Sequence, residues 1–364
     1  MKEGKVLFET FTVHENVLYF TEYRFNAVFS YNLLTDQMRL IAVLEAEKDE
    51  GKRLFGEIIY DKDCLYLIPF MAKNMYKIDL ANKNTVSICV KQSEVKCAKG
   101  LSCCAFSSAH LYDDSIYMFS SLTPTVMEYK IYSGEIVYYD NWWNENDYIL
   151  CENEKAFFRK TYIHQNCIYA PLCKTNAVLI MNITDKLINV IKIGSRNNGF
   201  SGICFDGNVF WLSPRRNGMI TRWDEKDGEI QTYAIENENV LDSANVVSNG
   251  KNTLLLPLCD TYVHALTEGQ IKEVDSVGKS CYFAAVKCEE KIYLFNGSEG
   301  RLYFIDKEIV WFKELYYPLE LARKFARYLS SFCFALLLGM PIEVINEGYC
   351  NNLGEFIRYI EEYK

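Results

Sequence analysis

The sequence predicts an all-β fold, a seven-bladed β-propeller of four-stranded antiparallel blades, with a short helical tail after it. Two observations support this. A short β-like run around an aromatic or leucine residue recurs seven times, each time with a turn before it and further β-like runs after it. Aromatic residues make up 15% of the 364-residue chain, and the abundant tyrosine and phenylalanine favour strands.

The seven runs align on one anchor position. The anchors are Tyr19, Tyr66, Tyr117, Tyr169, Trp211, Leu255 and Tyr293. Successive anchors lie 47, 51, 52, 42, 44 and 38 residues apart, a period that suits four short strands per repeat. Such sheets bury their faces by stacking on one another, and closing the ring removes exposed edges. Six blades is the alternative, if the weak sixth repeat is irregular.

We expect one propeller domain over residues 1–315 and a helical extension over residues 316–364. The blades are expected near residues 5–45, 54–91, 104–140, 157–194, 199–236, 242–277 and 281–315. After Pro318 the period breaks, and apolar residues recur at helical steps of three or four from Leu321 to Leu336. The extension is expected to pack on the propeller. Three basic residues beside its apolar stripe leave a peripheral membrane contact as the alternative.

Composition narrows the classes of partner. The net charge of −9 argues against general nucleic-acid binding, because an acidic chain repels a phosphate backbone. The N-terminus has no apolar signal-peptide core, which predicts a cytoplasmic protein. The fourteen cysteines have the dilute, strand-like placement of apolar fillers. Cys97, Cys103 and Cys104 come nearest to a metal pattern but lack CxxC spacing, so no metal or cofactor is expected.

The blade pattern resembles that of bacterial seven-bladed propellers, including streptogramin-lyase-like and kelch-like proteins and related propellers of Firmicutes. The resemblance covers roughly residues 5–315 and consists of the period and the strand pattern. The chain departs from these families because it lacks the kelch Gly-Gly pair, and Trp223-Asp224 is its one Trp-Asp pair. The resemblance therefore implies the fold, and the activities of these families do not transfer.

A basic residue stands beside or near an asparagine after the second strand of four repeats. These pairs are Arg24 and Asn26, Lys73 and Asn74, Lys174 and Asn176, and Arg216 and Asn217, with Arg215 adding a charge. The turns after the second strands share one rim of a propeller, so the sequence predicts a cluster there that binds carboxylate or phosphate. The alternative is that asparagine suits a left-handed turn and that the basic groups are solvated.

Two further features lie near that rim. Trp142 and Trp143, in the long link at residues 141–158, are expected either to stack on a sugar or partner, or to fill the groove between two blades. Counting back from each anchor to the channel mouth gives Thr10, Glu57, Ser108, Lys160, Gly202, Asn245 and Ala284. A pairing of Glu57 with Lys160 across this ring is an acid/base candidate, and a water-filled channel of satisfied polar groups is the alternative.

These observations favour a non-catalytic binding or scaffolding propeller that holds a protein partner or an anionic glycan on a basic, aromatic rim. The alternative is a propeller lyase or hydrolase that acts on a small carboxylated or glycosidic substrate. The four histidines do not obviously converge, because His14 and His164 occupy turns on the opposite face, His110 a first strand and His264 a third. No G-x-S-x-G nucleophile motif is present.

Overall fold

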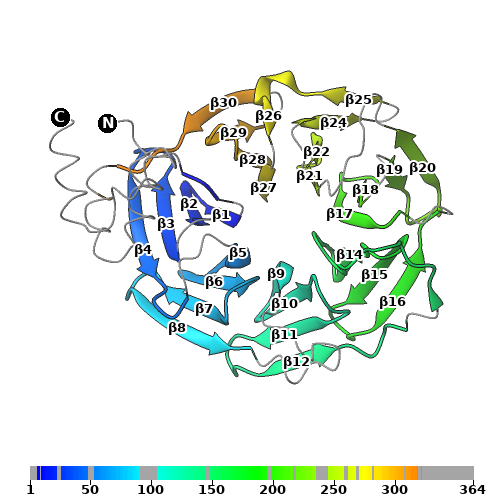
Figure 1. The fold of residues 1–364 in the computed structure, drawn as a ribbon, viewed down its shortest axis with the longest axis horizontal. Coiled ribbons are helices and arrows are strands. Elements are labelled where there is room, and N and C mark those ends of the chain that lie inside the picture. The colour runs from blue at the N-terminus through cyan, green and yellow to red at the C-terminus, as the bar shows by residue number, and fades with distance from the viewer. Residues whose placement is uncertain are drawn as a thin grey trace.

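Seven four-stranded antiparallel sheets stand around a central axis as the blades of a propeller (Figure 1). The computed structural model describes residues 6–8, 10–22, 26–47, 53–90, 105–144, 147–194, 198–215, 219–234, 245–257, 261–267, 270–280, 283–306, 309–318 and 321. The arrangement confirms the predicted fold class. The expected helical extension falls almost wholly outside the described residues.

Each blade is built from one continuous stretch of chain. Blade 1 comprises β1 (Thr10–His14), β2 (Val17–Thr21), β3 (Ala27–Asn32) and β4 (Met38–Val43). Blade 2 comprises β5 (Phe55–Asp61), β6 (Cys64–Pro69), β7 (Asn74–Asp79) and β8 (Asn84–Cys89). Blade 3 comprises β9 (Phe106–Tyr112), β10 (Ser115–Ser120), β11 (Val126–Lys130) and β12 (Ile136–Tyr139).

The fourth and fifth blades repeat this order. Blade 4 comprises β13 (Tyr162–His164), β14 (Cys167–Pro171), β15 (Ala177–Asn182) and β16 (Ile188–Lys192). Blade 5 comprises β17 (Phe200–Phe205), β18 (Phe210–Pro214), β19 (Met219–Trp223) and β20 (Ile230–Ala234).

The sixth blade is the irregular one, as the weak repeat suggested, but it is complete. It comprises β21 (Asn245–Ser248), β22 (Thr253–Leu256), β24 (His264–Thr267) and β25 (Gln270–Glu273). The short strand β23 (Thr261–Tyr262) leaves this order and pairs with β26 (Lys279–Ser280) after a 3-10 turn at Asp275–Val277. Blade 7 comprises β27 (Phe283–Cys288), β28 (Lys291–Asn296), β29 (Arg301–Ile305) and β30 (Ile309–Glu314).

All seven anchors lie in the second strand of their blades, so the repeat alignment is confirmed. The turn before each anchor contains a residue with positive φ. These residues are Glu15, Asp63, Asp113, Gln165, Gly207, Gly250 and Glu289. A tight turn with left-handed backbone fits the twist of a hairpin, which explains the polar and glycine residues at these points.

A buried phenylalanine recurs eleven residues before five of the anchors, a second repeat signal that the anchor alignment did not use. The five are Phe8, Phe55, Phe106, Phe158 and Phe200. Each packs where an inner strand begins, close to a neighbouring blade. Phe158 meets Phe119 of β10 at 5.5 Å between ring centroids, and Phe8 stacks on Phe295 of β28 at 3.9 Å. The core therefore lies between blades as well as within them.

The first and last blades contact each other and close the ring. The amide of Val6 donates a hydrogen bond to the carbonyl of Leu315 at 3.1 Å, and Lys313 donates to the Leu33 carbonyl and to Asp36. The first and last blades are each complete without strand exchange. In the described part of the chain, none of the helical segments has the length and hydropathy that crossing a bilayer requires.

Candidate functional site

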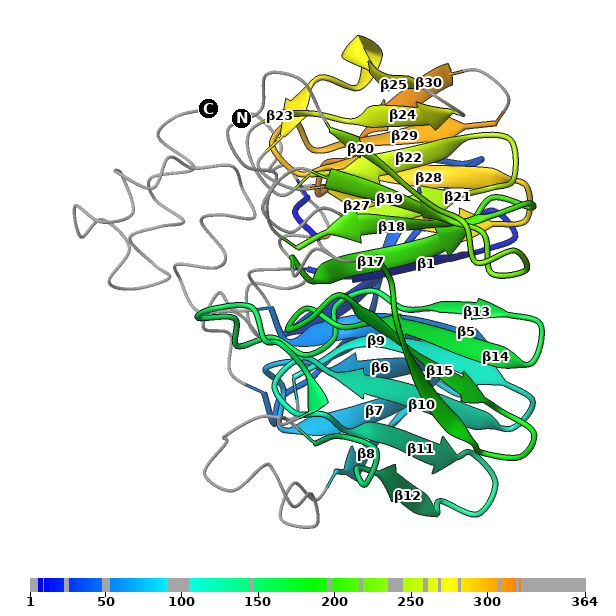
Figure 2. The ribbon, with the colours of Figure 1, turned by 90° about the vertical axis from the view of Figure 1, so that its right-hand side faces the viewer.

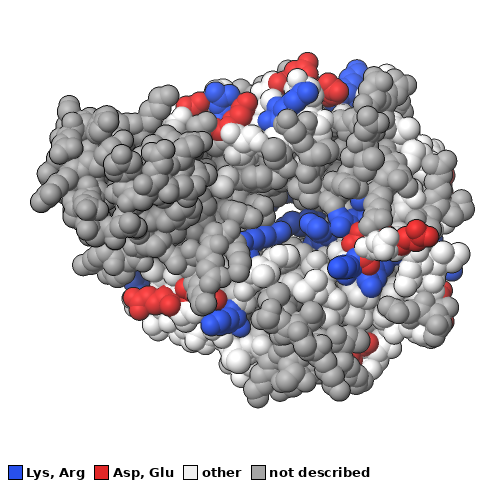
Figure 3. All heavy atoms as spheres, viewed as in Figure 1, with Lys and Arg blue, Asp and Glu red and all other residues white. Residues whose placement is uncertain are grey.

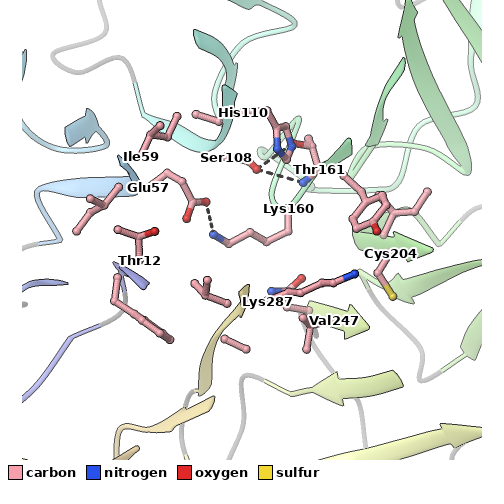
Figure 4. A pocket seen from close by; sticks show the side chains of 18 of the residues that line it. Thr12, Glu57, Ile59, Ser108, His110, Lys160, Thr161, Cys204, Val247 and Lys287 are labelled. Atoms are coloured by element: carbon pink, nitrogen blue, oxygen red, sulfur yellow. Dashed lines mark hydrogen bonds and ion pairs between the residues drawn. The ribbon is translucent and has the colours of Figure 1, made fainter. Parts of the chain in front are cut away.

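The inner strands of the blades line a channel with a cavity of about 380 Å³ (Figure 4). One end opens on what we call the link face, which carries the links between blades, such as residues 140–161, and the turns after the second strands, such as residues 172–176 (Figure 2). The channel wall carries polar and charged side chains. Among them are Glu57, His110, Lys160, Asn245 and Lys287.

Bulges in three inner strands set the side chains at the channel mouth. In β5, β9 and β17 one extra residue follows the buried phenylalanine, and the register shifts there. The extra residues are small: Gly56, Ser107 and Ser201. A Cβ on Gly56 would lie 1.9 Å from the Phe106 carbonyl oxygen, so only glycine fits between β5 and β9. A bulge re-aims the next side chain, which in β5 is Glu57.

Glu57 and Lys160 meet across the channel mouth, as the sequence predicted. The Lys160 Nζ lies 2.7 Å from the Glu57 Oε2, with both side chains partly exposed (Figure 4). Glu57 comes from blade 2, whereas Lys160 lies just before β13 of blade 4, where its amide donates to the Ser201 carbonyl. Four of the seven predicted ring residues line the cavity: Glu57, Ser108, Lys160 and Asn245.

His110 lies next to this pair on β9 and belongs to a chain of hydrogen bonds (Figure 4). Its Nε2 lies 2.7 Å from the Thr161 hydroxyl, and that hydroxyl donates to the Ser108 hydroxyl at 2.9 Å. Burial lowers the pKa of His110 to about 4, and the positive charge of Lys160 contributes. The imidazole is therefore neutral at pH 7 and can accept a proton.

Among the predicted rim residues, the structure places two asparagines in structural hydrogen bonds. The Asn26 Nδ2 donates to the carbonyls of Leu44 and Glu47, and the Asn176 Nδ2 donates to those of Ile193 and Gly194. Both side chains thus tie the turn after the second strand to the link that leaves the blade. Neither residue has a left-handed backbone.

The two rim lysines, Lys73 and Lys174, have different contacts among the described residues. The amides of Lys73 and Asn74 donate to the Glu47 carboxylate, and the Lys73 side chain is exposed. The Lys174 Nζ sits 4.5 Å from the ring centroid of Phe157. Arg24, Arg216 and Asn217 lie outside the described residues.

Arg215 is held in an ion pair with Glu154. Its Nε donates to Glu154 Oε2 at 2.7 Å, and its Nη2 donates to Glu154 Oε1 at 3.2 Å. The Glu154 side chain is buried, and its Oε1 also accepts from the Ala156 amide at 2.8 Å. On the link face, lysine and arginine side chains gather along the lower and right side of the central opening (Figure 3).

Trp142 and Trp143 pack between blades 3 and 4. Trp143 stacks on Tyr148 at 4.5 Å and meets Phe157 edge-on at 5.3 Å, whereas Trp142 lies 5.8 Å from Phe158. Both indoles join the hydrophobic cluster of the fourth blade. This is the groove-filling arrangement that the sequence offered as one of two alternatives.

Several residues of this region escaped the sequence reasoning. Arg53, Glu154 and Lys287 lie outside the repeated basic-asparagine pattern, so no periodic signal marks them. Arg159 occupies the position of Gly56, Ser107 and Ser201 in the repeat, and this exchange of a small residue for arginine is visible in the aligned sequence. The described residues contain no group of three or more His, Cys, Asp or Glu side chains placed to share a metal ion.

No family model and no curated protein matches this chain in sequence. Solved structures match its fold. The virginiamycin B lyase of Staphylococcus aureus has a TM-score of 0.60 at 14% identity, over 80% of this chain and 94% of the lyase. An inactive variant of that lyase, solved with quinupristin, has a TM-score of 0.61 at 14% identity, over 82% and 94% of the two chains.

A protein of different role has a similar fold. PorZ of Porphyromonas gingivalis, a surface component of the type-IX secretion system, has a TM-score of 0.58 at 8% identity, over 87% of this chain and 39% of PorZ. At such identities the likeness shows the seven-bladed fold alone. Lyases and non-lyase propellers both share it, so activity has to be argued from the site.

Proposed function

We propose that this protein is a binding propeller that captures an anionic, hydroxyl-rich ligand, such as an acidic glycan, at the link-face mouth of its channel. The observation that carries the proposal is the Glu57–Lys160 ion pair in a channel cavity that both polar and apolar side chains line. Carboxylate oxygens accept from sugar hydroxyls, and an ammonium group donates to hydroxyls and carboxylates. His110, Asn245 and Lys287 add further polar groups along the wall.

The channel mouth is a better site for such a ligand than the aromatic part of the rim. Trp142 and Trp143 are engaged with Phe158, Tyr148 and Phe157, and so contribute to packing between blades. Asn26 and Asn176 are engaged with backbone carbonyls. Lys160 and Arg215 are among the described basic residues of this region that could still meet such a ligand. A protein partner with an acidic segment is the other occupant that a binding experiment has to distinguish.

An array of acidic and neutral glycans probed with the full chain tests this function. We expect retention on acidic members and at least a tenfold loss of affinity in Lys160→Met, since a charged hydrogen bond contributes roughly 1.5–3 kcal/mol. Lys130→Met is the matched control, because its Nζ also lies 2.7 Å from a carboxylate, that of Glu135, in a turn on the opposite face. Equal retention by Lys160→Met and wild type would place the ligand elsewhere.

Catalysis is the second candidate, and the neutral imidazole of His110 beside the Glu57–Lys160 pair favours it. Glu57 and Lys160 are then the acid and base of a lyase or hydrolase. Quinupristin, the ligand named for the similar lyase structure, is a direct probe. Conversion detected by mass spectrometry in wild type and absent in Glu57→Gln would support an enzyme, and an unchanged ligand with retained glycan binding would favour the binding function.

A further inference from the structure

Arg159 holds a buried guanidinium nitrogen that has no partner. Its Nε is enclosed by protein and makes no hydrogen bond, and no hydrogen bond or ion pair is found for its side chain among the described residues. Arginine stays protonated in proteins and carries five donors. Arg159 as a residue is partly exposed, but a donor enclosed by protein without an acceptor is unfavourable, so its Nε lacks a hydrogen bond that a ligand could supply.

Other guanidinium groups lie close by. Burial lowers the pKa of Arg159, and the positive charge of Arg215 lowers it further, as does that of Arg53. Cys173 and Glu154 oppose this effect. The Glu154 carboxylate is held by Arg215 and by the Ala156 amide, so its oxygens already have donors. The negative charge of Glu154 is therefore shared with Arg215 and only partly balances the positive charge of Arg159.

The repeat position of Arg159 holds a small residue in three other blades. The equivalent residues in the second, third and fifth blades are Gly56, Ser107 and Ser201, all small. The backbone around Arg159 follows the common pattern, because the Ser107 hydroxyl donates to the Phe158 carbonyl and the Lys160 amide donates to the Ser201 carbonyl. The arginine is an addition to a frame that small residues complete in other blades.

Arg159 also lies beside the channel mouth. Lys160, the next residue, extends into the cavity and pairs with Glu57 (Figure 4). Arg53, in the link before β5, donates from Nε and Nη2 to the carbonyls of Phe55 and Gly56, which fixes it near the start of the inner strand of blade 2. Basic side chains lie along the lower and right side of this opening in the view onto the link face (Figure 3).

We propose that Arg159, flanked by Arg53 and Arg215, binds an oxyanion group, a carboxylate or a phosphate, at the channel mouth. The Nε and Nη donors of a guanidinium match two oxygens of such a group, and the flanking charges add attraction in a partly buried place. The inference rests on the proposed function, because it assigns the anionic group of the channel ligand. The anion site can still be measured without that ligand.

Thermal unfolding and calorimetry of the full chain test this site with two probes, inorganic phosphate and sodium glucuronate, at an ionic strength held constant with chloride. We expect phosphate, glucuronate or both to bind the wild-type protein and to raise the temperature of its unfolding midpoint. Arg159→Met should have a higher midpoint than wild type without any probe, because it removes a partly buried charge that Arg215 and Arg53 repel. It should also lose the response. Arg159→Lys should keep a weaker response.

Arg301→Met is the matched control, since Glu299 and Glu314 each lie 3.0 Å from the Arg301 guanidinium on the outer part of blade 7. It should respond to the probes as wild type does. A response to phosphate alone or to glucuronate alone supports the site and identifies the source of the oxyanion. Equal responses in wild type and Arg159→Met, or none in wild type, would overturn it.

Lys160→Met separates this inference from the proposed function. Loss of glycan capture in Lys160→Met with an intact anion response supports both. Glycan capture by wild type without any anion response overturns the anion site and leaves the proposed function standing. An anion response without glycan capture retains the site and removes the glycan as its ligand.

Discussion

His110 shows how the channel wall sets the charge state of one side chain. The imidazole projects from β9 and is partly buried in the channel wall, where its Nε2 meets the Thr161 hydroxyl and Lys160 lies close to it. Both the loss of hydration and the nearby positive charge disfavour the imidazolium form. The fold therefore selects the neutral form, whose Nε2 and Nδ1 can serve as one donor and one acceptor.

The preference of the folded protein for neutral His110 should appear in the pH dependence of its stability. His110 has a pKa of about 4 when folded against 6.5 ordinarily, so between these values the unfolded chain binds more protons. The stability that His110 contributes is present above pH 6.5 and is lost as the pH falls toward 4. Urea unfolding should show wild type losing up to about 2 kcal/mol more than His110→Gln over this range. The same loss in both proteins would contradict the assignment.

For single residues, the sequence predicted the positions that follow from the repeat. Glu57 and Lys160 occupy equivalent positions in two blades, so counting from the anchors placed both at the channel mouth, and their pairing is confirmed. The contacts of Trp142, Asn26 and Arg215 depend on the paths of links, whose lengths vary from blade to blade. No periodic pattern records such paths, and for that reason the rim could not be built from the sequence.

At the scale of single strands, the bulged inner strand is the element that shapes the mouth. The small residue in each bulge lets one inner strand approach the next, and the following residue points to the channel. The anchors and turns were predictable because hairpin turns and strand periods leave local signals. The bulge was missed because one extra residue leaves the period almost unchanged. The recurring phenylalanine that precedes it was available as a signal.

Gly56→Ala tests the close approach of the inner strands. The added Cβ would lie 1.9 Å from the Phe106 carbonyl oxygen, a backbone atom that cannot turn aside. We expect the free energy of unfolding to fall by roughly 1–3 kcal/mol, as for other overpacked sites. Ser107→Ala is the control, since that position already holds a Cβ and loses one hydrogen bond. An effect no larger than that of the control would argue against the close approach.

At the scale of the whole molecule, the ring depends on a junction between its first and last blades. Phe8 is buried and stacks on Phe295, while Val6 and Leu315 share a backbone hydrogen bond. Lys313 links the last strand of blade 7 to the turn after β3. One hydrophobic cluster that includes Phe8, Phe20 and Phe295 spans the two blades, so packing as well as hydrogen bonding closes the ring.

Phe8→Ala should therefore weaken the junction. Loss of a buried phenylalanine costs roughly 3–5 kcal/mol, and here the loss falls on contacts between blades 1 and 7. Hydrogen exchange should rise first in β1, β27 and β28 of the variant. Leu34→Ala, at a side chain that is 73% exposed, is the control and should leave exchange unchanged. Uniform exchange across all blades of Phe8→Ala would show that the junction is no weaker than the rest.

Because every blade is encoded by one unbroken stretch of sequence, the blade is also a unit that can be duplicated, lost or moved whole. In a propeller whose last blade is completed by a strand from the other end of the chain, one blade is divided between two stretches of sequence. Moving either stretch would leave that blade incomplete. Val6 and Leu315 share a backbone hydrogen bond, so the start of blade 1 and the end of blade 7 could be joined and new ends opened in a link between two other blades. Circular permutants cut between different blades would then compare the junctions of the ring one at a time.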